Sequence, residues 1–126
     1  MFSLTINTVF SAAHALSING VRETVHGHDW NVTATVVGEK LDADGLLCDF
    51  HTVKDVLEDI TGGLNSRDLN DHAAFANRNA SAELVAKHIF DELHTRLDEA
   101  LAPHARVASV RVTESPGCAA TYSPDA

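Results

Sequence analysis

The chain contains two kinds of hydrophobic spacing, and their order limits the folds that it can adopt. Patterns typical of strands occupy residues 2–10, in a strand that reaches nearly to His14, then the stretch after His28 to about Val37, and residues 107–114 and 118–122. Between the two pairs of strands, apolar residues recur at helical spacing, first at Val53, Val56, Leu57, Ile60 and Leu64, then at Val85, Ile89, Leu93, Leu97 and Leu101. The order ββααββ predicts one α+β domain over residues 1–126, with a four-stranded antiparallel sheet and both helices on one face.

The segments between these elements carry turn and capping residues. Residues 17–20 end in Asn19-Gly20, which tolerates positive φ and predicts a turn between the first two strands. Asn79 or Ser81 is expected to begin the second helix. Residues 64–79 form a long polar loop, and a loop of this length in a small domain is usually functional.

Three histidines lie where the first two strands should meet. His26 and His28 are two residues apart at the start of the second strand, so both imidazoles point to the same face. His14 ends the first strand, and antiparallel pairing brings it beside them. Three histidines without a fourth protein ligand are typical of a catalytic zinc site, which keeps one position open. The other histidines with no such pattern are interpreted as surface or core residues: His51, His88, His94 and His104.

Two further parts of the chain place a carboxylate where it could take part in binding or catalysis. Glu114 ends a strand face that it shares with Ala108, Val110 and Val112, and a half-buried carboxylate requires polar partners. In the polar loop, Asp71-His72 places a carboxylate beside an imidazole, a pair that can transfer protons near neutral pH.

The net charge and the cysteine content limit the partners and the cellular compartment that we expect. The formal net charge is -9, which argues against nucleic acid or an anionic membrane as a partner. Cys48 and Cys118 do not make a disulfide framework, and no signal peptide or membrane-spanning segment is evident. We therefore expect a cytoplasmic protein.

The ordered set of motifs resembles one enzyme family over nearly the whole chain. It resembles the 6-pyruvoyl-tetrahydropterin synthases and the related 6-carboxy-tetrahydropterin synthases. The matching segments, in chain order, are Phe10-Ser11-Ala12-Ala13-His14, His26-Gly27-His28, Cys48-Asp49-Phe50 with Lys54, Asp71-His72, Asn79-Ala80-Ser81-Ala82-Glu83, and Thr113-Glu114 ending in Tyr122.

This resemblance implies a tunnelling fold, a homohexamer built from two trimers with the pocket between neighbouring subunits, and a zinc-dependent enzyme. The implied substrate is dihydroneopterin triphosphate, a small pterin whose three-carbon side chain is the reacting part. By position in the motifs, the implied roles are zinc ligation by His14, His26 and His28, acid–base catalysis by Asp71 and His72, pterin anchoring by Glu114, and substrate binding by Ser81.

One departure from the family bears on the reaction. Members that make the pyruvoyl or carboxy product have a cysteine shortly before His-Gly-His that acts as the general base. Residues 21–25 of this chain contain no cysteine. The spacing from Glu23 to His26 instead resembles a subgroup with glutamate in place of the cysteine, which is associated with 6-hydroxymethyl-dihydropterin for folate synthesis. A carboxylate removed from water can act as a base. Glu23 is therefore the predicted base, and Cys118 is a weaker candidate.

Other functions stay open at this point. The alternatives are a 6-carboxy-tetrahydropterin synthase for queuosine and deazapurine synthesis, a 6-pyruvoyl-tetrahydropterin synthase, and a non-catalytic pterin-binding module. An acidic chain needs local positive charge to bind a triphosphate. The candidates for that charge are Arg22, Arg67, Arg78 and Lys54.

Overall fold

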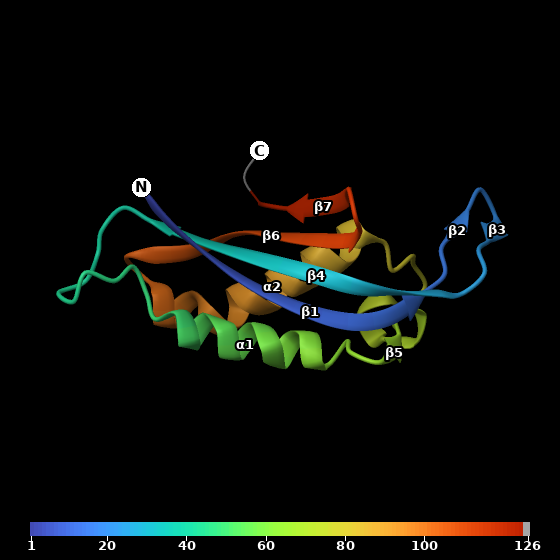
Figure 1. The fold of residues 1–126 in the computed structure, drawn as a ribbon, viewed down its shortest axis with the longest axis horizontal. Coiled ribbons are helices and arrows are strands. Elements are labelled where there is room, and N and C mark those ends of the chain that lie inside the picture. The colour runs from blue at the N-terminus through green and yellow to red at the C-terminus, as the bar shows by residue number, and fades with distance from the viewer. Residues whose placement is uncertain (125–126) are drawn as a thin grey trace.

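Three long strands and one short strand form an antiparallel sheet in the computed structural model, which describes residues 1–124 (Figure 1). They are β1 (Phe2–His14), β4 (His26–Gly38), β6 (Ala105–Ser115) and β7 (Cys118–Tyr122). The predicted antiparallel sheet is therefore confirmed. A two-residue strand, β5 (Arg67–Asp68), adds a parallel edge beside β1 that the sequence pattern did not indicate, and the order is β5-β1-β4-β6-β7.

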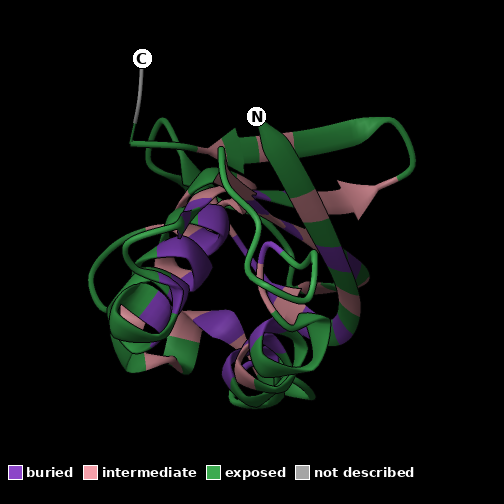
Figure 2. Cartoon of the chain, turned by 90° about the vertical axis from the view of Figure 1, so that its left-hand side faces the viewer, coloured by how far each residue is buried: buried purple, intermediate pink, exposed green. Residues whose placement is uncertain are grey.

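Both helices, α1 (Phe50–Gly62) and α2 (Ala82–Leu101), cover the same face of this sheet (Figure 1), as predicted. Their buried sides face the sheet, and much of the opposite sheet face is exposed (Figure 2). Phe10 and Trp30 stack between the layers, with ring centroids 5.8 Å apart. Neither helix in the described part is long and apolar enough to cross a membrane.

A small hairpin follows His14 and leads into β4. It consists of β2 (Ser17–Ile18) and β3 (Val21–Arg22), and it extends beyond the end of the main sheet (Figure 1). Asn19 and Gly20 have φ of 53° and 80°, which confirms the predicted turn. Two successive positive φ angles match the right-handed twist of a tight hairpin.

The polar loop before α2 is ordered by a few apolar anchors. After β5 it forms two one-turn 3₁₀ helices, η1 (Leu69–Asp71) and η2 (Ala73–Phe75). Leu69 and Phe75 are buried in the core beside them. Ser81 then caps α2, because its Oγ accepts a hydrogen bond of 3.2 Å from the backbone N–H of Leu84.

Strand β6 contains a bulge that corrects one prediction. Thr35 pairs with Ser109 while Val36 pairs with Val107, so Ala108 is an extra residue in the ladder. Because an extra residue reverses the alternation, Val107 is buried and Ala108 is only partly buried. The prediction that Ala108 shares the inward face of β6 is wrong.

Candidate metal centre and active site

The pairing of β1 with β4 brings the three predicted histidines together. His14 pairs directly with His26, and Ala12 pairs with His28. The three imidazole rings contact one another edge to face, with centroids 4.7 to 5.2 Å apart. Trp30, the next inward residue of β4, closes the cluster on the core side and donates its indole N–H to Ala12 O at 3.1 Å.

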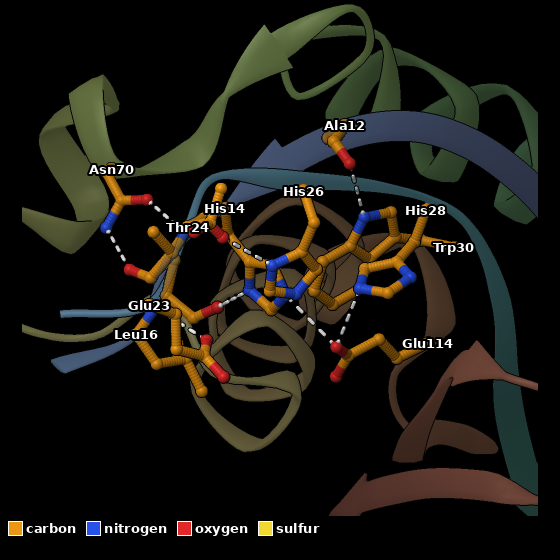
Figure 3. Close-up of polar contacts among 12 residues, drawn as sticks. Ala12, His14, Leu16, Glu23, Thr24, His26, His28, Trp30, Asn70 and Glu114 are labelled. Carbon is orange, nitrogen blue, oxygen red and sulfur yellow. Dashed lines mark hydrogen bonds and ion pairs between the residues drawn. The ribbon is translucent and has the colours of Figure 1, made fainter. Parts of the chain in front are cut away.

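Glu114 joins the cluster from the far end of the chain (Figure 3). Its Oε1 lies 3.0 Å from Nε2 of His14 and 2.9 Å from Nε2 of His28. Thr113 pairs with Ala119, whereas Ser115 pairs with Cys118, the residue next to Ala119. Glu114 is therefore an extra residue in β6 and lies at a second bulge. Bulges often redirect a side chain next to a functional site. Ligand atoms of His14, His26, His28 and Glu114 all lie within 4.8 Å of one another.

Backbone carbonyls determine which ring nitrogens of two histidines carry a proton. His14 Nδ1 lies 2.8 Å from Ala80 O, and His26 Nδ1 lies 2.9 Å from Thr24 O. A carbonyl only accepts, so each Nδ1–H must donate to it. In the neutral imidazoles the Nε2 lone pairs are then directed into the cluster, as in metal-binding histidines whose second nitrogen is held by the protein.

The side chains of the cluster are better arranged to bind a cation than to form hydrogen bonds with one another. In its neutral form, with the proton on Nδ1, His14 would present a lone pair to the Glu114 carboxylate, and two acceptors in contact repel each other. His28 Nε2 is buried and, among the described residues, has no hydrogen-bond partner, because its short contact with Glu114 is poorly aligned. Three imidazole nitrogens and a carboxylate oxygen are zinc ligands. The residues present therefore fit a metal ion.

The backbone that follows His14 is held by three side chains. Asn70 accepts from Ala15 N at 2.7 Å and donates to Ala15 O at 2.9 Å. Asn79 makes the same pair of bonds to Ser17, at 2.8 and 3.0 Å. These two asparagines were not predicted as site residues. The only signal for them was their place in a polar loop, which does not show where an amide points.

Glu23 is the third of these side chains. Its Oε1 accepts from Leu16 N at 2.9 Å, and its own N–H donates to Leu16 O at 2.8 Å. In Figure 3, Glu23 and Glu114 lie on either side of the histidines. Glu23 is exposed to solvent in the single chain. A role for this carboxylate as a base would require its burial by a bound molecule or by another subunit.

Asp71 and His72 lie apart from this cluster. Asp71 is exposed and ends η1, whereas His72 is half-buried and its Nδ1 accepts from Ala74 N at 3.1 Å. The His72 ring contacts Phe75 and His88, with centroids 5.8 and 5.5 Å away. No hydrogen bond, ion pair or ring contact within residues 1–124 joins Asp71 or His72 to the histidine cluster.

His88 is half-buried on α2, and its imidazole contacts that of His72. Burial lowers its pKa, and the neighbouring His72 lowers it further. A lowered pKa keeps the imidazole neutral at physiological pH. Its contact with His72 was not foreseen, because the two residues lie on different elements.

The two cysteines have different surroundings. Cys48 is partly buried, and this burial, together with the nearby Asp49 carboxylate, raises the pKa of its thiol. A raised pKa disfavours the reactive thiolate. Cys118 is exposed and lines a pocket that also includes Glu114 and Glu83. The turn after β6 thus brings Cys118 near Glu114.

Comparison with known proteins gives consistent results. A sequence model of the 6-pyruvoyl tetrahydropterin synthase family matches residues 3–125. The chain is 33% identical to the 6-carboxy-5,6,7,8-tetrahydropterin synthase of Bacillus subtilis, over 98% of this chain and 86% of the relative.

Solved structures of the same fold include a Plasmodium vivax 6-pyruvoyltetrahydropterin synthase in which a catalytic glutamate is replaced by alanine, with a TM-score of 0.81, 21% identity and 96% of each chain covered. The Caenorhabditis elegans 6-pyruvoyl tetrahydropterin synthase matches with a TM-score of 0.78 and 22% identity, over 99% of this chain and 98% of that one. These neighbours confirm the predicted tunnelling fold. The chain belongs to the 6-pyruvoyl tetrahydropterin synthase family.

Proposed function

We propose that the protein is a cytoplasmic, zinc-dependent lyase that cleaves the side chain of dihydroneopterin triphosphate to give 6-hydroxymethyl-dihydropterin. The observation that carries this proposal is the cluster of His14, His26 and His28, with Glu23 and Glu114 on either side (Figure 3). Two carboxylates on opposite sides of a metal centre can serve different purposes, one for proton removal and one for recognition.

The three histidines would hold the metal through their Nε2 atoms. When bound, zinc supplies a Lewis acid that polarises the side-chain hydroxyls of the substrate. His14 and His26 donate from Nδ1–H to Ala80 O and Thr24 O, and these hydrogen bonds leave their Nε2 lone pairs available to a metal ion. Glu114 would leave the histidines and accept two parallel hydrogen bonds from the amino group and N3 of the pterin ring.

Glu23 would act as the base. It takes the proton of the 2′ hydroxyl, the C1′–C2′ bond breaks, and the bonding electrons pass into the pterin ring. C1′ is then protonated, which releases 6-hydroxymethyl-dihydropterin and a two-carbon aldehyde that carries the triphosphate. This route needs neither an oxidant nor a cysteine. A catalytic glutamate in the Plasmodium vivax relative supports the use of this residue type within the fold.

Asp71 and His72 would complete the site from a neighbouring subunit. Among the described residues, no hydrogen bond, ion pair or ring contact joins them to the histidine cluster of their own chain. His72 is nevertheless half-buried and, with its Nδ1 accepting from Ala74, presents Nε2–H as a donor. The family resemblance implies a hexamer of two trimers with pockets between subunits. In that assembly His72 would protonate the product and Ser81, at the start of α2, would donate its hydroxyl proton to the substrate.

The first test is incubation of the zinc-loaded protein with dihydroneopterin triphosphate, followed by mass analysis of the pterins. A 6-hydroxymethyl product supports the proposal. Glu23→Gln should then lose at least about a hundredfold in kcat, in the range expected for a missing base. Cys118→Ser is the matched control and should keep its activity. Normal turnover by Glu23→Gln would exclude Glu23 as the base.

A second candidate is 6-carboxy-tetrahydropterin synthase activity. The 33% identity to the Bacillus subtilis enzyme of that name favours it. A 6-carboxy or 6-pyruvoyl product in the same assay would support this activity class and would point to another base, with Cys118 tested first. Tight pterin binding without any product would instead support a non-catalytic binding module.

A further inference from the structure

Two arginines converge on one pocket beside the metal cluster. The pocket has a volume of about 400 Å³, and its polar lining consists of Arg22, Arg78, Asn70, Asn77, Asn79 and Ser17. Pockets of this size accommodate small ligands. Within the part of the chain that the structure describes, none of the residues that line it carries a carboxylate. In a chain with 18 acidic and 9 basic residues, such a lining is unusual and favours an anion.

Lys54 and Arg67, the other basic residues considered for triphosphate binding, lie close to carboxylates. Lys54 forms an ion pair with Glu58, 3.8 Å away on the same helix. Arg67 lines a different pocket whose lining also includes Asp29 and Asp68. Carboxylates would repel a polyanion, so neither candidate offers it an uncompensated positive charge.

Arg78 and Arg22 differ in how they are held. Arg78 donates from both Nε and Nη2 to Ala74 O, at 3.3 and 2.9 Å, which fixes the plane of its guanidinium. Its remaining N–H groups are available to a ligand. Arg22 pairs with Ser17 through its backbone in the β2–β3 hairpin, but its guanidinium makes no hydrogen bond or ion pair with any other residue between 1 and 124. Guanidinium groups bind phosphate oxygens through paired hydrogen bonds.

The pocket is adjacent to the backbone that carries the metal cluster. Ala15, the residue after His14, lines it, and Asn79 precedes Ala80, whose carbonyl holds the His14 ring. A substrate with its reacting carbons at the histidines could thus extend an anionic tail past Ala15 toward the arginines. Phe75, which contacts His72, forms part of the same lining.

We propose that Arg22 and Arg78, with the neighbouring asparagine amides, form the binding site for the polyphosphate tail of the substrate. This inference deepens the proposed function and rests on it for the identity of the ligand. The chemistry that it requires is a chain of two or three phosphate groups, either ester-linked or inorganic. The Arg22 guanidinium would reorient to bind the phosphate groups, and the Arg78 guanidinium would bind them from the fixed position set by Ala74 O.

The test measures binding of inorganic tripolyphosphate to the zinc-loaded protein by calorimetry. Because hydrogen bonds to charged groups contribute about 1.5–3 kcal/mol, Arg22→Gln and Arg78→Gln should each raise the Kd about tenfold or more. Arg96→Gln is the matched control, since Arg96 lies on α2 in ion pairs with Asp59 and Glu92. It removes the same charge and should leave the Kd within about twofold of wild type.

The variant comparison also separates the arginines from the metal. Tripolyphosphate that binds to zinc itself does so equally in all variants, so only the difference between them reports on the pocket. Arg22→Gln removes no side-chain hydrogen bond or ion pair within the described residues and is expected to fold, which circular dichroism would verify. Equal affinities in Arg22→Gln and wild type, or an equal loss in Arg96→Gln, would overturn the proposal.

A second measurement distinguishes the source of the phosphates. If the tail belongs to the pterin substrate, Arg22→Gln should raise the KM for dihydroneopterin triphosphate about tenfold and leave its affinity for dihydroneopterin unchanged. A protein that binds tripolyphosphate through both arginines but turns over no pterin would uphold this site and contradict the proposed lyase. A lyase whose KM is insensitive to both arginines would uphold the activity and overturn the site.

Discussion

Replacement of Asn70 by alanine should weaken both the fold and the metal site. The amide makes two partly buried hydrogen bonds to Ala15, at 2.7 and 2.9 Å, immediately after His14. At about 1–1.5 kcal/mol for each bond, their loss lowers the free energy of unfolding by about 2–3 kcal/mol. The unfolding entropy of a chain of 126 residues is about 0.26 kcal/mol/K, so Tm should fall by about 8–11 °C.

The same substitution should raise the zinc Kd about tenfold, the effect usually seen when a group that positions a ligand is removed. Stability is measured by denaturant unfolding of metal-free protein, so that zinc affinity does not enter, and the Kd by competition with a chelator. Val36→Ala is the matched control. Val36 is fully buried at the other end of β4, and its truncation costs about 2–3 kcal/mol without touching the histidines.

Two results would refute this reasoning. A loss of less than about 1 kcal/mol in Asn70→Ala would mean that water replaces the amide at Ala15. An equal rise in the zinc Kd for Val36→Ala would mean that metal affinity follows global stability rather than the position of His14.

Three further predictions concern the site. His26→Ala should lose stoichiometric zinc by elemental analysis, whereas His94→Ala, an exposed control, should retain it. Glu114→Gln should keep zinc and raise the KM for substrate about tenfold or more; loss of zinc would make Glu114 a ligand instead of the pterin anchor. Because burial and His72 lower the pKa of His88 below its ordinary 6.5, the unfolded chain binds more protons, so stability should fall as pH drops below 6.5. His88→Gln should reduce that acid sensitivity in unfolding measured from pH 7 to pH 5.

The elements predicted most accurately were those that local chemistry specifies. Asn19 and Gly20 adopt the positive φ angles that their residue types tolerate, and Ser81 caps α2 as its hydroxyl allows. The meeting of His14 and His26 followed from side-chain alternation and antiparallel pairing alone. These features need no information about distant parts of the chain.

The features that the sequence did not reveal depend on partners far away. The bulge at Ala108 depends on how β6 aligns with β4, and alternation by itself cannot show an extra residue. Asn70 bonds to Ala15 across 55 positions, and the contact of His88 with His72 depends on how the loop packs against α2. Glu114 was expected to contact pterin, and its approach to the histidines reflects a second local change in register.

The metal cluster links residues from almost the whole length of the chain. His14 and Glu114 are 100 positions apart, and β6 completes the cluster only after both helices have been made. During synthesis, a ribosome-bound chain would hold the first three ligands long before the fourth group emerged. Because all three histidines proposed to hold the metal lie before residue 29, a truncated chain that ends before β6 would still carry them and would lack only the Glu114 carboxylate. Substrate binding, and not metal content, would therefore distinguish full-length molecules from truncated ones.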